Sequence, residues 1–329
     1  MSVFVRAAAL VSLAVGVPTA HAATFCVGTL DELSAAIVAG QLNHQPDDYR
    51  LRAGTYLLAA PIRIYAFDAQ GASFSGGWDP ACTSQALVPG ATVVDGQGAS
   101  ALFDIREPGA PPVNFVLDHL TLRGGSTADE HVVSIQGQNA TVRVAHCVFA
   151  ANVAGGATRA LLAIRTGKPV DVLDNAFVGN SFAGRAIDVD LVAASQPDGA
   201  LRRVLGNTIA FNTSTGGTAI RSGRAATIAN NLTWGNGTTL DVDTLPDSNV
   251  LGNSLQHGAL PGNTTGDPHL QAGSWKLLGT SPLRDAGVGV AVTGTASTRD
   301  LDGDARVRGA AIDIGADELG PAQFADGFE

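Results

Sequence analysis

Four stretches of this chain repeat nearly the same order of apolar and polar residues. They are VRVAHCVFAAN (142–152), VDVLDNAFVGN (170–180), RRVLGNTIAFN (202–212) and ATIANNLTWGN (226–236). Each stretch closes on an asparagine, and successive closing asparagines lie 28, 32 and 24 residues apart. A phrase that recurs every ~20–50 residues is typical of a solenoid, in which each copy is one supersecondary unit stacked on the next.

Within each stretch, the spacing indicates short strands joined by a tight corner. A β-branched residue such as Val172 comes three positions before Asn175, and Phe177 follows two positions later. No helical stripe emerges from this spacing. Asparagine tolerates the left-handed backbone of a corner, and stacked asparagine amides can bond to one another at the strand spacing of about 4.8 Å. The pattern predicts a parallel β-helix, with a β-sandwich with polar turns as the alternative.

This pattern resembles the right-handed parallel β-helix repeat of the pectate-lyase-like superfamily. The stretch DDYRLRAGTY (47–56) is similar to the first strand of that superfamily, and TVVDGQG (92–98) to a further early coil. Thr29 and Glu32 form a capping box, so we expect a short helix over residues 30–39 that ends at Gly40. Such a helix would cap the open end of the coil, where strand edges and apolar interior are exposed.

The C-terminal part carries the most specific resemblance. SPLRDAG (281–287) and STRDLDGDARVRGAAIDIGADE (297–318) are similar to the closing signature of bacterial "choice-of-anchor Q" β-helix proteins. The matching residues are Ser281, Pro282, Asp285, Ala286, Gly287, Asp300, Asp302, Gly303, Arg306, Asp313, Ile314, Gly315, Ala316 and Glu318. Asp317 stands where that family often has Tyr. The resemblance implies a fold and export, because the family has no single agreed activity.

The repeats run without a linker, so we expect one elongated, monomeric domain with an export signal. Arg6 precedes an apolar run at 7–17, and small residues allow cleavage after Ala22. The predicted organisation is a signal peptide (1–22), a parallel β-helix with its N-terminal cap (23–254), a loop and closing segment (255–318) and a tail (319–329). Export leads to an oxidising compartment. There we expect Cys26 and Cys82, both in the cap region, to form a disulfide, and Cys147 to be a buried free thiol.

Composition narrows the possible partners. Charged residues make up 15% of the chain and 40 residues are glycine, as expected for a coil with many corners. The formal net charge of −10 argues against a nucleic-acid partner. A polyanionic substrate would need local arginines or bound cations.

A second strand after each phrase points to a charged outer face. If Ile135, Ile164, Ile187, Ile220 and Leu240 point inward, alternation sends the residues that follow them outward. The predicted outward column is Gln136, Arg165, Asp188, Arg221 and Asp241. Asp190 and Asp243 are expected on the same face. The structural interpretation is a set of ion pairs between adjacent coils.

The functional interpretation makes this column a polysaccharide site, because in the resembling superfamily the substrate groove commonly runs along one outer sheet. Asp188, Asp190, Asp241 and Asp243 would supply oxygen ligands for Ca²⁺, the one cofactor we consider. Gln136, Arg165, Asp188, Arg221 and Asp241 would bind substrate, and Arg221 or Arg165 would be catalytic in a lyase-like β-elimination. The insertion AASQPDG (193–199) would form a wall of this groove.

Two other functional classes of protein remain as alternatives. A non-catalytic surface, adhesive or spacer protein is the first, and a glycoside hydrolase is the weaker second. The sequence lacks Arg-x-Pro-x-x-Arg and the polygalacturonase motifs, and Leu117-Asp118-His119 is interpreted as core geometry. The acids at 300, 302 and 304 do not fit an EF-hand, so we expect them to pair with Arg299, Arg306 and Arg308. The scattered histidines show no zinc-ligand spacing.

Overall fold

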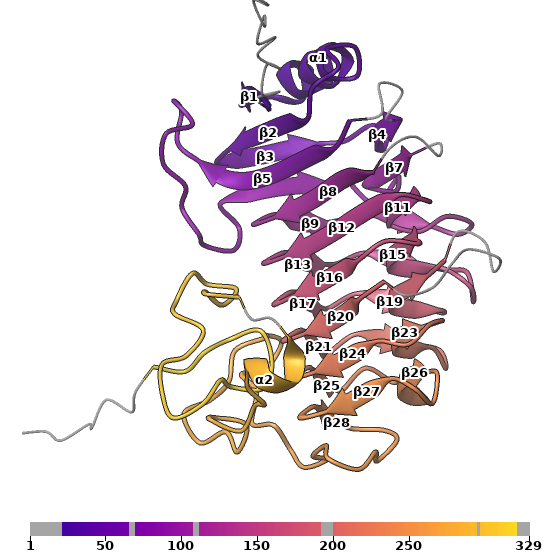
Figure 1. The fold of residues 1–329 in the computed structure, drawn as a ribbon, viewed down its shortest axis with the longest axis vertical. Helices are drawn as coiled ribbons and strands as arrows, with labels where there is room; N and C mark the ends of the chain where they lie inside the picture. Colours follow the sequence, from indigo (N-terminus) through magenta and orange to yellow (C-terminus); the bar gives the residue numbers. More distant parts are fainter. Residues whose placement is uncertain (1–21, 66–69, 108–111, 192–199, 295–296, 321–329) are drawn as a thin grey trace, which may run out of the picture.

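The backbone coils through three long parallel sheets and one short one (Figure 1). This computed structural model describes residues 22–65, 70–107, 112–191, 200–294 and 297–320. Every pairing between its named strands is parallel and joins one coil to the next. The predicted all-β parallel β-helix is therefore confirmed over the described residues, and a β-sandwich, whose strands pair antiparallel, is excluded.

The sheets are named here by the strands that they hold. Sheet A consists of β1 (Ala23–Val27), β2 (Asp47–Arg52), β5 (Ala72–Trp78), β8 (Val113–Asp118), β12 (Ala140–Ala145), β16 (Val170–Leu173), β20 (Arg202–Leu205), β24 (Thr227–Ala229) and β27 (Asn249–Leu251). Sheet B consists of β3 (Gly54–Leu57), β6 (Thr92–Asp95), β9 (Thr121–Arg123), β13 (Val148–Ala150), β17 (Ala176–Val178), β21 (Thr208–Ala210), β25 (Leu232–Trp234) and β28 (Ser254–Leu255). Sheet C consists of β4 (Ile62–Tyr65), β7 (Phe103–Glu107), β11 (Val133–Gly137), β15 (Ala160–Thr166), β19 (Arg185–Asp190), β23 (Thr218–Ser222) and β26 (Leu240–Thr244). The short sheet D consists of β10 (Ser126–Thr127), β14 (Val153–Ala154), β18 (Ser181–Phe182) and β22 (Thr213–Ser214).

The core is a set of apolar rows that run along the axis of the coil. In sheet C the register places Val133 beside Leu162 and Leu162 beside Ile187, and all three side chains are fully buried. In sheet B the rings of Phe149 and Phe177 stack with their centroids 4.3 Å apart. Because side chains alternate along each strand, these inward rows send their neighbours to the outer faces.

Two asparagine ladders, buried except for Asn263 at the end of the first, stand on either side of sheet B. The first ladder precedes its strands and consists of Asn175, Asn207, Asn231, Asn253 and Asn263. The second ladder follows them and consists of Asn152, Asn180, Asn212 and Asn236. In the first ladder each Nδ2 donates to the next Oδ1 over 2.7–2.9 Å, and in the second over 2.8–3.0 Å. The predicted internal ladder is thus confirmed.

The sequence led us to expect the left-handed backbone of each corner at the asparagine itself, and the structure differs from this expectation. The left-handed backbone falls one residue earlier than the asparagine, at Asp174 (φ 52°) before Asn175 and at Gly206 (φ 66°) before Asn207. This turn directs the asparagine side chain inward, where its amide can reach backbone groups of the coil before and the asparagine of the coil after. Cys147 occupies the first position of this row as a buried free thiol, as predicted. Burial raises the pKa of this thiol, which makes it unreactive.

A helix covers the first coil, as the capping box predicts. Helix α1 spans Leu30–Gly40, and Thr29 Oγ1 accepts the Glu32 N–H over 3.1 Å. Glu32 also accepts the Gly28 N–H and pairs with Arg52 on β2 at 2.9 Å. The helix lies across the end of the coil in Figure 1, so it covers the apolar interior there. Among the described residues, no helix is long and apolar enough to cross a lipid bilayer.

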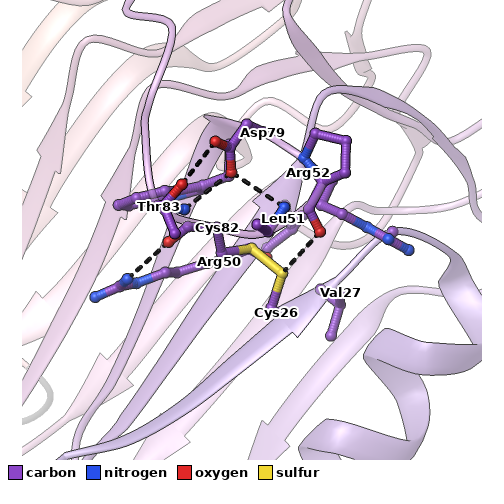
Figure 2. Close-up of a disulfide and its surroundings, with 12 residues drawn as sticks. Cys26, Val27, Arg50, Leu51, Arg52, Asp79, Cys82 and Thr83 are labelled. Carbon is purple, nitrogen blue, oxygen red and sulfur yellow. Dashed lines mark hydrogen bonds between the residues drawn. A yellow bond between two sulfur atoms is a disulfide. The ribbon is translucent and has the colours of Figure 1, made fainter.

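The predicted disulfide joins Cys26 of β1 to Cys82 in the loop after β5 (Figure 2). Their Cα atoms lie 5.8 Å apart across a sequence separation of 56 residues. Arg50 donates to the Cys82 carbonyl over 3.1 Å, and Asp79 accepts the Thr83 N–H and hydroxyl within the same loop. These hydrogen bonds from Thr83, with others in the loop, lower the pKa of Asp79 to about 2. The loop is therefore held by both covalent and polar contacts.

After the last coil the chain turns back over the outer face of sheet B. Leu301 and Ala316 pack against Val148, Ala176 and Val178. Further along the coil, Leu277, Leu283 and Ile314 pack against Leu232. Figure 1 shows this segment in yellow beside the later coils, with the short α2 (Val290–Thr293) in front of them. The segment thus covers an apolar surface that the solenoid alone would expose.

The residues that carry the choice-of-anchor Q resemblance form one hydrogen-bonded network in this segment. Arg306, almost fully buried, pairs with Asp174 of the coil at 3.0 Å and with Glu318 at 2.5 Å. Asp313 accepts the N–H groups of Asp285 and Leu319. The motif residues are therefore explained as the parts that fold this segment and attach it to the solenoid.

The arginine partners expected for the three acids at 300–304 are correct in one case. Asp304 pairs with Arg308 at 2.5 Å. Asp302 instead pairs with Lys276. Asp300 accepts the N–H groups of its own loop and of Glu318, because its burial leaves backbone donors as the nearest groups.

Asp317 gives this segment a pH-dependent stability. Burial raises the pKa of Asp317 to about 6 from an ordinary 3.8, so the folded state holds this proton more tightly than the unfolded chain. The protonated Asp317 carboxyl therefore makes its full contribution to the free energy of unfolding below about pH 4. This contribution is lost as the pH rises to about 6. We predict that Asp317→Asn, which keeps an acceptor for the Leu277 N–H, is more stable than the wild type at pH 7 by about 2–3 kcal/mol.

The measurement is urea unfolding of the variant and the wild type at pH 4, 5, 6 and 7. The exposed Asp247→Asn is the matched control, and its difference from the wild type should not change with pH. A stability difference for Asp317→Asn that is constant across this range would contradict the prediction.

Candidate functional site

The charged outer face of sheet C is the site that the sequence predicts, and the register divides it into two rows. One row runs Ser134, Ala163, Asp188, Arg221 and Asp243. The other runs Arg106, Gln136, Arg165 and Asp190. The predicted single column of Gln136, Arg165, Asp188, Arg221 and Asp241 is therefore wrong in its register at β19 and β26.

The physical reason is a shift of two residues. Ile187 pairs with Leu162 instead of Ile164, and Val242 instead of Leu240 pairs with Ile220. A shift of two preserves the alternation, so the aspartates stay on the predicted face of their strands. Their partners on the neighbouring coils change.

Asp188 is the centre of an ion-pair cluster on this face. Its carboxylate is fully buried beneath three guanidinium groups, at 2.5 Å from Arg165, 2.9 Å from Arg221 and 3.4 Å from Arg185. Arg221 also contacts Asp190 at 3.0 Å. With Asp243 at 3.7 Å from Arg221, the cluster sets three carboxylates against three guanidinium groups from adjacent coils, as the structural interpretation of the column predicts.

This environment does not support a catalytic base at Arg221. Burial disfavours the charged form, but the hydrogen bonds and charges of Asp188 and Asp190 outweigh burial and raise the pKa of Arg221 above its usual range. A proton-abstracting arginine needs the opposite shift. Arg165 shares the same carboxylate and lies against the Asp188 carbonyl as well.

The four aspartates proposed as calcium ligands do not converge on one point. Asp188 and Asp190 are bound to arginines, and Asp243 lies 3.7 Å from Arg221. Asp241 is fully buried apart from them, where it accepts the Thr238 hydroxyl over 2.9 Å and a backbone N–H over 2.6 Å. No cluster of three possible ligand groups in the described part of the chain includes any of the four. The wall predicted at 193–199 lies outside the described residues.

A cavity of about 210 Å³ opens on the same face beside Gln136. Its polar lining is Asp104, Arg106, Asp129, Glu130, His131, Ser134, Gln136 and Arg159. Arg106 donates to Asp104 over 2.9 Å, and Gln136 donates to the Ser134 hydroxyl over 2.9 Å. Burial, with the charge of Arg165, lowers the pKa of His131 to about 4, so this histidine is neutral at pH 7. The lining therefore offers both donors and acceptors, with carboxylates in excess over arginines.

Sequence reasoning missed a second group at the corner between sheets A and B. Asp118 and His119 follow the core residue Leu117, and His146 lies one coil further on, with its Nδ1 2.8 Å from Asp118 Oδ1. The scattered spacing hid this cluster. An alignment of VLDHLTL (116–122) with VAHCVF (144–149) could have revealed the cluster, because it places both histidines at the same corner of successive coils.

No family model, curated protein or solved structure matches this chain. Its function is therefore inferred from the fold and from the geometry of these two sites.

The ion-pair cluster leads to a prediction about stability. Removing the charge of Asp188 leaves three guanidinium groups without their shared partner, so Asp188→Asn should lower the free energy of unfolding by about 3–5 kcal/mol. Asp243→Asn is the matched control, because this half-exposed carboxylate touches only the edge of the cluster at 3.7 Å and should cost less than about 1 kcal/mol. Urea unfolding checks both variants. Equal effects of the two substitutions would refute the central role of Asp188.

Proposed function

We propose that this chain is an exported, pectate-lyase-like β-helix protein of the choice-of-anchor Q type that binds a polysaccharide on the outer face of sheet C. The closing-segment residues and the expected signal peptide support the family and the export, although residues 1–21 lie outside the described part of the chain. The cavity beside Gln136 carries the proposal for the ligand. Its neighbouring coils present polar side chains in regular rows, which suits a polymer with a repeating unit.

The charges of the cavity favour a neutral polymer over a polyuronate. Arg106 and Arg159 face three carboxylates, those of Asp104, Asp129 and Glu130. Hydroxyl groups of a sugar can donate to carboxylates and accept from arginine and glutamine, whereas a uronate carboxylate would meet repulsion. The arginines further along the face are paired with Asp188. Binding without catalysis follows best from this arrangement, because neither Arg165 nor Arg221 is free to act as a base.

Affinity electrophoresis of the mature protein in gels that contain neutral or acidic polysaccharides tests this proposal. We predict retardation by a neutral polymer and about tenfold weaker binding by Arg106→Ala, which removes a donor from the cavity. Arg123→Ala is the matched control. Arg123 is similarly exposed and pairs with Asp95 at 2.8 Å, as Arg106 does with Asp104 at 2.9 Å, but it lies on sheet B.

Equal weakening by both variants would contradict a site at the cavity. Failure to bind any polymer would favour the spacer alternative. Release of unsaturated uronate products, measured by ultraviolet absorbance with and without a chelator, would establish the lyase alternative instead. Release of reducing ends without such products would indicate the glycoside hydrolase.

A further inference from the structure

Two histidines are stacked at one corner of the coil. His119 follows β8 and His146 follows β12, and the register sets Asp118 beside Ala145 between these strands. Both histidines have left-handed backbone, with φ 52° and 50°. Their rings lie 4.6 Å apart between centroids at an angle of 32°. The regular stacking of the coils thus brings two imidazoles and one carboxylate together.

The nitrogen and oxygen atoms of this cluster face one another at short range. Asp118 Oδ1 lies 2.8 Å from His146 Nδ1 and 3.0 Å from His119 Nδ1. Both histidine side chains are only 8% exposed. The His119 contact does not have the alignment of a hydrogen bond, and among the described residues neither ring nitrogen of His119 has a hydrogen-bond partner. Buried polar atoms without a partner are rare in folded proteins, and they point to a group that the polypeptide does not supply.

A neighbouring carbonyl and an opening to solvent make these three atoms suitable as metal ligands. The Arg299 carbonyl of the closing segment lies 3.3 Å from His146 Nε2 and can accept a proton held there, so that Nδ1 would be free to bind a metal in place of its contact with Asp118. Asp118 is 28% exposed, which leaves one side of the cluster open to solvent.

We propose that Asp118 Oδ1, His119 Nδ1 and His146 Nδ1 bind one Zn²⁺ ion. Two imidazoles and a carboxylate are ligands that zinc takes at about 2.0–2.2 Å, and three protein ligands leave a fourth position for water on the open side. All three ligand atoms lie within 4.8 Å of one another, so small side-chain movements bring them around one ion. An Asp118–His146 pair alone leaves His119 Nδ1 near the carboxylate but without an aligned hydrogen bond, whereas a bound metal would take that nitrogen as a ligand.

Zinc binding to the purified, oxidised chain tests this inference. The protein is dialysed against ZnCl₂ and then against metal-free buffer, its zinc is measured by mass spectrometry, and Kd is measured by competition with a chromophoric chelator. We expect one Zn²⁺ per chain in the wild type and a Kd at least about 100-fold weaker in His119→Asn and in His146→Asn. Asparagine suits these variants because it tolerates the left-handed backbone.

His269→Asn is the matched control. His269 also has a left-handed backbone (φ 51°) and makes a side-chain contact with the Thr280 carbonyl, away from the cluster. Its substitution should leave zinc stoichiometry and Kd unchanged.

X-ray absorption of the zinc-loaded wild type is a second readout that needs no variant. We expect a shell of nitrogen and oxygen with the outer scattering of two imidazoles. An absence of stoichiometric zinc, a shell without two imidazoles, or undiminished binding in both cluster variants would overturn the proposal.

Discussion

The buried asparagine amides are the interaction on which the rest of this structure depends. Each amide must satisfy two donors and an acceptor inside an apolar coil, because an unmet buried hydrogen bond costs about 1–3 kcal/mol. Asn207 meets this demand only when one coil lies at strand spacing before it and another after it, since it donates to Val172 O and Asn231 Oδ1 and accepts from Asn175. A slip of one residue would leave these partners unmet and reverse the faces of every strand. The ladders therefore fix the register of the coils from about residue 147 to residue 263.

That register determines which side chains lie next to one another on the outer faces. On sheet C it brings Asp188, Asp190 and Asp243 together with three arginines from neighbouring coils, so the charges of this cluster balance. The cavity beside Gln136 lies on the same face and is lined by further donors and acceptors. At the corner before sheet B it stacks His119 on His146. The closing segment then attaches to the same row through Arg306 and Asp174.

The sequence predicts the repeating parts of this molecule well and the non-repeating parts poorly. Asn175 and its equivalents are visible because a ladder requires the same residue once per coil. The pairing partner of Asp188 could not be predicted by counting residues from one coil to the next, because the corner that precedes β19 is shorter than the one that precedes β15. Corners tolerate such changes in length without altering the strands. The Arg306–Asp174 pair joins positions that no repeat relates. The motif around Arg306 signalled its importance without revealing its partner.

The most direct test of this account is the free energy of unfolding of Asn207→Ala against that of Asn249→Ala, measured in urea at one pH. Asn207 is fully buried within the first ladder, whereas Asn249 is an exposed residue of β27. The account predicts a loss of about 3 kcal/mol for Asn207→Ala, because its neighbours lose their partners, and within about 0.5 kcal/mol of the wild type for Asn249→Ala. Equal, small losses for the two variants would contradict it.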